Sequence, residues 1–132
     1  MQPDISDLKN SLTPVFQAHR DALIFGYLFG SRATGEENQK SDIDIAVFVY
    51  EPSSFSFSDR LLLHGEFCRK LRRNDIDLII LNQANNLILL DQIIRSGIVI
   101  WDSNPSKREE FELRLQHAAI DFKYQRTREM GL

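Results

Sequence analysis

The sequence lacks the features that mark secreted, membrane-spanning and nucleic-acid-binding proteins. Its single cysteine, Cys68, excludes a disulfide within the chain and favours a reducing, cytoplasmic location. Residues 1–4 do not resemble a signal peptide, and no apolar run is long enough to span a membrane. The net charge of −3 disfavours a broadly basic surface, so we expect no direct binding of nucleic acid.

The composition is that of a folded protein with one domain. The chain has 132 residues, of which 42% are hydrophobic and 27% are charged. This length gives a hydrophobic core of modest size, and neither repeats nor a low-complexity linker divide the chain. We therefore expect a single domain over residues 1–132.

The stretch from Gly30 to Asp44 carries the strongest chemical signal. Residues 24–29 form a short apolar and aromatic run that is typical of a buried strand. Gly30 ends this run, and a residue without Cβ permits a sharp turn close to a ligand. Ser31 follows, where the N–H groups at the start of a helical turn favour an anion such as phosphate.

Two aspartates, Asp42 and Asp44, begin the next apolar run, which extends to Tyr50. Residues two apart on a strand point to the same face, so both carboxylates lie side by side. Two such charges about 4 Å apart repel by roughly 4 kcal/mol at an effective dielectric constant near 20. A shared proton or a cation is needed, and Mg²⁺ binds through carboxylates and substrate phosphates. The stretch therefore indicates nucleotide chemistry.

This stretch resembles the signature of the DNA polymerase β-like nucleotidyltransferases. The pattern Gly-Ser-x-Ala-x-Gly-x5-Ser-Asp-x-Asp is matched at Gly30, Ser31, Ala33, Gly35, Ser41, Asp42 and Asp44. Thr34 stands where many members carry arginine, with Arg32 and Lys40 nearby. The resemblance covers a catalytic core of about residues 20–103. The short chain is similar to the minimal nucleotidyltransferases, which include MntA-type antitoxins paired with HEPN-domain toxins.

The resemblance implies a set of site residues. Asp42, Asp44 and a third carboxylate on an adjacent strand would hold two Mg²⁺ ions. Residues Gly30, Ser31, Arg32 and Ser41 would bind the triphosphate of ATP. Both Asp75 and Asp77 share the required face of the strand at 74–81, and we favour Asp77 because it lies inside the strand, whereas Asp is common at turns for local reasons.

The resemblance also implies a reaction. AMP would pass from ATP to a protein hydroxyl, a tyrosine of a cognate HEPN toxin, and the chain would act as the antitoxin of a type VII toxin–antitoxin pair. One alternative is an antitoxin that neutralises its toxin by contact alone. Another is transfer to a small molecule such as an aminoglycoside, although relatives of that kind usually carry an additional domain.

The remaining sequence predicts helices that alternate with strands. Helical spacing covers residues 5–19, where Pro14 is expected to kink or split the helix. A helix capped by Ser56 and Asp59 is expected to reach about Arg72. It would bury Leu62, Leu63, Phe67, Cys68 and Leu71.

Further helices are expected over residues 87–94 and about 106–128. The last of them would be capped by Ser106, with Glu109 at the capping-box position. A short closing strand at 98–101 is expected near a sheet edge. The pattern predicts an α/β (α+β) two-layer fold with a small mixed β-sheet flanked by helices.

Overall fold

The structure is a computed structural model that describes residues 4–30 and 42–129. A four-stranded sheet forms its centre, with the strand order β3-β2-β1-β4. The central strand β1 pairs antiparallel with β2 and β4, whereas β2 and β3 run parallel. The strands are β1 (Leu23–Phe29), β2 (Ile43–Val49), β3 (Ile76–Ile80) and β4 (Ile98–Asp102). The sheet is therefore mixed, and β4 lies at an edge as predicted.

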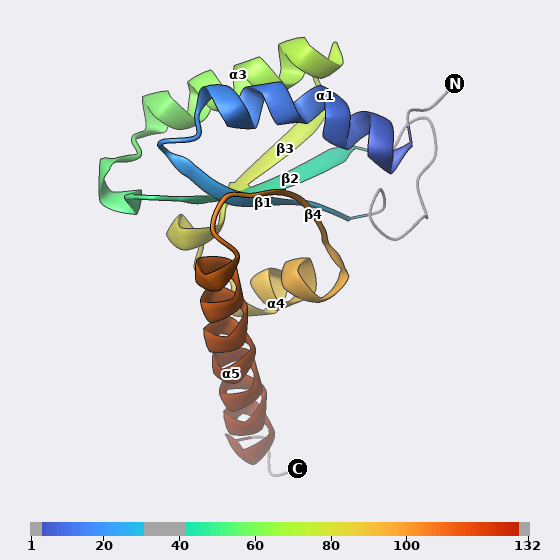
Figure 1. The fold of residues 1–132 in the computed structure, drawn as a ribbon. Helices are drawn as coiled ribbons and strands as arrows, with labels where there is room; N and C mark the ends of the chain where they lie inside the picture. Colours follow the sequence, from blue (N-terminus) through green and yellow to red (C-terminus); the bar gives the residue numbers. More distant parts are fainter. Residues whose placement is uncertain (1–3, 31–41, 130–132) are drawn as a thin grey trace.

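Helices cover both faces of this sheet. In the described parts of the chain they are α1 (Ile5–Ala18), α3 (Phe57–Leu71), α4 (Leu87–Ser96) and α5 (Pro105–Glu129). Figure 1 shows α1 and α3 side by side over one face and α4 with α5 against the other. The predicted α/β fold with a small mixed sheet flanked by helices is thus confirmed. No helix among the described residues is both long and apolar enough to cross a membrane.

The first core lies between the sheet and the pair α1–α3. Helix α1 buries Leu8, Leu12 and Phe16, and the Phe16 ring packs on strand β1 at Gly26. A Cβ atom at Gly26 would lie only 2.8 Å from the Phe16 ring, so the absence of a side chain lets helix and sheet approach. Trp101 of β4 stacks against the same ring, at 5.8 Å between centroids.

One expectation about these helices was wrong, and the structure decides part of another. Pro14 does not split the first helix, because α1 continues through it to Ala18. The apolar stripe of α1 is buried on both sides of Pro14, and this packing outweighs the hydrogen bond that proline removes. Leu62 is not buried but 63% exposed, since it lies one position off the face of α3 that carries Leu63 and Phe67.

The cap of the last helix also differs from the prediction. Helix α5 begins at Pro105, one residue before Ser106. The Asn104 side chain accepts a hydrogen bond from the Lys107 backbone N–H at 3.1 Å. Asparagine is a strong capping residue, and proline suits the first helical position because no N–H is needed there. Asn104 therefore caps this helix in place of Ser106.

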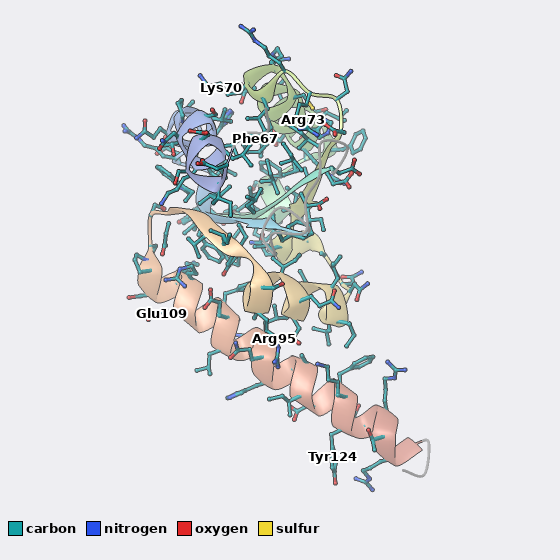
Figure 2. All side chains as sticks on the ribbon, turned by 90° about the vertical axis from the view of Figure 1, so that its right-hand side faces the viewer. Phe67, Lys70, Arg73, Arg95, Glu109 and Tyr124 are labelled. Carbon is teal, nitrogen blue, oxygen red and sulfur yellow. The ribbon has the colours of Figure 1, made fainter. Side chains whose placement is uncertain are left out.

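Helix α5 is fixed to the body of the protein by polar contacts. The buried Tyr27 hydroxyl donates to Glu112 at 2.5 Å, and Arg108 bridges Glu112 and Asp102. Burial, reinforced by Glu112, raises the pKa of Tyr27 well above its usual range. Beyond these contacts, α5 extends past the sheet toward the labelled Tyr124, which is exposed (Figure 2).

Candidate active site

Asp44 and Asp77 lie next to each other at the start of the parallel strand pair. They are register partners in β2 and β3. Partner residues in paired strands project to the same face, which here is the face covered by α4 and α5. Burial raises the pKa of Asp44 to about 6, and a hydrogen bond to Asp77 and the charge of Asp77 add to this. The two carboxyls are therefore close enough to share a proton.

Asp42 is the third predicted carboxylate of the motif. It is exposed, directly before β2, and its charge also raises the pKa of Asp44. Across residues 4–30 and 42–129, no group of three His, Cys, Asp or Glu side chains is arranged to hold a metal ion. What the structure brings together is the pair Asp44 and Asp77, with Asp42 near enough to act electrostatically.

The carboxylate of Asp44 explains why residue 30 is a glycine. The residue has a positive φ of 76°, a conformation that side chains other than glycine rarely adopt. A Cβ atom there would lie 2.2 Å from the Asp44 Oδ2 atom. Glycine at this position therefore lets the turn after β1 lie directly against the Asp44 carboxylate.

A cavity of about 390 Å³ opens beside the carboxylate pair. It extends around the edge strand β3 and receives side chains from both faces of the sheet. Its lining combines the acidic pair, two basic or polar side chains of α3 and apolar walls: Phe29, Asp44, Arg60, His64, Ile76, Asp77, Leu78, Ile79 and Leu89. Such a mixed pocket can hold a reacting group against two carboxylates.

The structure separates the two candidates for the third carboxylate. Asp75 lies before β3, and its side chain is engaged by Arg73 through two hydrogen bonds of 2.7 and 2.5 Å. Asp77 instead faces Asp44 across the strand pair. The strand register therefore places Asp77, and not Asp75, next to Asp44. The predicted phosphate-binding residues Ser31, Arg32 and Ser41 lie outside the described residues.

Two residues that line the cavity were missed by the sequence reasoning. Neither Arg60 nor His64 was singled out as a site residue. They lie four residues apart on α3, so they share one face of that helix. This spacing is a weak signal, because only the tertiary structure shows that the shared face meets the edge of β3.

Known proteins match this chain in family and in fold. The family described as polymerase beta, nucleotidyltransferase matches residues 10–106. No curated protein matches the chain. A solved chain from a toxin–antitoxin complex with AMP-PNP superposes with a TM-score of 0.78 at 24% identity, covering 93% of this chain and 95% of that one.

Two further solved chains have the same fold. One comes from an MntA toxin–antitoxin complex with a tyrosine-to-alanine substitution (TM-score 0.76, 25% identity, 93% and 94% covered). The other comes from a complex of an MNT antitoxin with the tri-AMPylated HEPN toxin of Shewanella oneidensis (TM-score 0.73, 22% identity, 94% and 93% covered). Because the family match spans most of the chain and includes the Gly30, Asp44 and Asp77 site, this protein belongs to the polymerase β nucleotidyltransferase family.

Proposed function

We propose that this chain is a Mg²⁺-dependent adenylyltransferase that moves AMP from ATP to a tyrosine hydroxyl of a HEPN-domain toxin, and that this reaction makes it the antitoxin of the pair. The observation that carries the proposal is the Asp44–Asp77 carboxylate pair, which lies beside the turn at Gly30. The cavity beside the pair offers space for the reacting group.

The donor set suits a hard divalent cation. Asp42, Asp44 and Asp77 offer carboxylate oxygens only, and the pKa of Asp44 is raised first by burial and then by the other two carboxylates. A cation would relieve the same repulsion that a proton relieves. We propose that these three residues hold Mg²⁺, as two ions when ATP is bound. When bound, Mg²⁺ would offset the charge of the triphosphate and lower the pKa of the attacking hydroxyl.

The chain's own residues then have distinct roles. Gly30, Ser31, Arg32 and Ser41 would orient the triphosphate, with glycine allowing the backbone to approach closely. Asp77 would accept the proton of the attacking hydroxyl, which the cavity beside the carboxylate pair would hold. The oxygen–phosphorus bond to AMP forms as the bond to pyrophosphate breaks. Catalysis would depend mainly on positioning and electrostatics.

The solved relatives support the nucleotide and the partner. One was solved with AMP-PNP, an ATP analogue, and one is an antitoxin in complex with an AMPylated HEPN toxin. These statements concern those proteins. For this chain they favour ATP as the donor and a HEPN protein as the acceptor over a small-molecule acceptor.

The test is the intact mass of the HEPN protein encoded by the adjacent gene after incubation with this chain, ATP and Mg²⁺. We expect one or more AMP increments with the unmodified enzyme and with Asp121→Asn, an exposed carboxylate on α5 that serves as the matched control. Asp42→Asn and Asp44→Asn should give none. A stable complex without any mass increment would instead establish an antitoxin that acts by contact.

A further inference from the structure

Strand β3 is an edge strand, and Asp77 lies on it. Among the strands of the described residues, only β2 pairs with β3, so one side of β3 has no neighbouring strand there. In a parallel pair, the backbone groups of alternate residues point toward the partner and away from it. The carbonyls of Ile76 and Leu78 point away from β2, and they flank Asp77 on either side. Without hydrogen-bond donors for these carbonyls, residues 76–78 would be free to shift.

Two side chains of α3 hold these carbonyls. His64 donates from Nε2 to the Ile76 carbonyl oxygen at 2.7 Å. The Arg60 guanidinium donates to the Leu78 carbonyl oxygen at 2.9 Å. The backbone carbonyls of both residues that flank Asp77 are therefore tied to the same helix.

The helix that supplies these two side chains is itself well fixed. Ser56 and Asp59 form a reciprocal capping box at its start, and Phe67 is fully buried beneath it. Arg60 and His64 lie one helical turn apart, which matches the spacing of two alternate carbonyls on a strand. The helix thus acts as a rigid support along the open edge of β3.

We propose that Arg60 and His64 are positioning residues that set the place of the Asp77 carboxylate relative to Asp44. This inference rests on the proposed adenylyl transfer, in which Asp77 accepts the proton of the attacking hydroxyl. They act on Asp77 through the backbone of β3. A displaced Asp77 slows the chemical step, whereas ATP binding depends mainly on the turn at Gly30.

The experiment compares Arg60→Met and His64→Leu with the wild type at saturating HEPN protein and varied ATP. Misplacement of a catalytic group by about 1 Å costs up to about 100-fold in rate, so we expect kcat to fall about 10- to 100-fold. The KM for ATP should stay within about twofold, because the substrate's own contacts are unchanged.

Conservative variants and a matched control separate positioning from general stability. Arg60→Lys and His64→Gln retain an N–H donor for the same carbonyls and should recover most of the lost kcat. Arg69→Met, an exposed arginine on the same helix that does not line the cavity, should leave kcat unchanged. Melting temperatures of all variants show which of them remain folded.

Three results would overturn the inference. An unchanged kcat in folded Arg60→Met and His64→Leu would show that Asp77 needs no support, and a raised KM at constant kcat would show direct substrate contact. The third readout does not need activity, because crystal structures of the variants and the wild type report the separation of the Asp44 and Asp77 carboxylates. An unmoved Asp77 refutes positioning even if the wild type transfers no AMP, a result that would refute the proposed function separately.

Discussion

The carboxylate pair should limit the stability of the metal-free protein, and Asp44→Asn should therefore stabilise it at neutral and alkaline pH. The pKa of Asp44 is raised from 3.8 to about 6, first by burial and then by Asp77 and Asp42. The folded state thus binds a proton more tightly than the unfolded chain does. The resulting stabilisation is fully present below about pH 4 and is lost as the pH rises through about 6.

The size of the effect follows from that difference in pKa. A rise from 3.8 to about 6 corresponds to at most about 3 kcal/mol. Because Asp44 is only partly buried, solvent screening reduces this to about 1–2 kcal/mol. Asp44→Asn removes the charge and keeps the size of the side chain. We expect it to raise the free energy of unfolding by about 1–2 kcal/mol at pH 8 and by roughly half as much near pH 5.

Thermal unfolding in EDTA at pH 5 and pH 8 measures this directly. For a chain of this length a gain of 1 kcal/mol raises the melting temperature by about 3–5 °C. Asp121→Asn, on the exposed surface of α5, serves as the control for removal of one negative charge. Adding Mg²⁺ at pH 8 should stabilise the wild type more than Asp44→Asn, since a cation relieves the same repulsion. An equal melting temperature of Asp44→Asn and the wild type at pH 8 would refute the reasoning.

Two further substitutions test the packing around the site and the attachment of α5. Gly30→Ala should destabilise the fold by about 1–2 kcal/mol and abolish AMP transfer, because residue 30 has a left-handed backbone conformation and its Cβ would meet Asp44. Gly65→Ala in α3 is the control. Its Cβ would meet only the end of a flexible arginine, so it should be tolerated in the same unfolding and transfer assays. Tyr27→Phe removes the hydrogen bond to Glu112 and should lower the free energy of unfolding by about 1–2 kcal/mol in denaturant titrations, and an unchanged midpoint would contradict a structural role for that bond.

Local patterns in the sequence were sufficient for much of the fold. Periodicity predicted the helices, because each buries one face and its apolar residues recur at the matching interval, and short apolar runs predicted the central strands, which are buried on both faces. Capping chemistry placed the start of α3 correctly, since Ser56 and Asp59 contact each other within one turn. The same logic failed at Ser106, because Asn104 and Pro105 together start α5 two residues earlier than a Ser106 cap would.

The chemical signature was also local. Gly30, Asp42 and Asp44 lie within fifteen residues, and their types and spacing indicated a phosphate-binding turn beside a carboxylate pair. What Gly30 does could be seen only in the structure, where it leaves room for the Asp44 carboxylate itself.

Only the tertiary structure decided how the distant parts meet. Both Asp75 and Asp77 satisfied the strand parity, and the parallel register of β2 and β3 brought Asp77 opposite Asp44 while Arg73 engaged Asp75. The contacts of Arg60 and His64 with the β3 edge likewise depend on how α3 packs against the sheet. The sequence by itself determined the elements and the motif, because these depend on neighbouring residues, whereas strand pairing and helix docking depend on contacts between residues far apart in the chain.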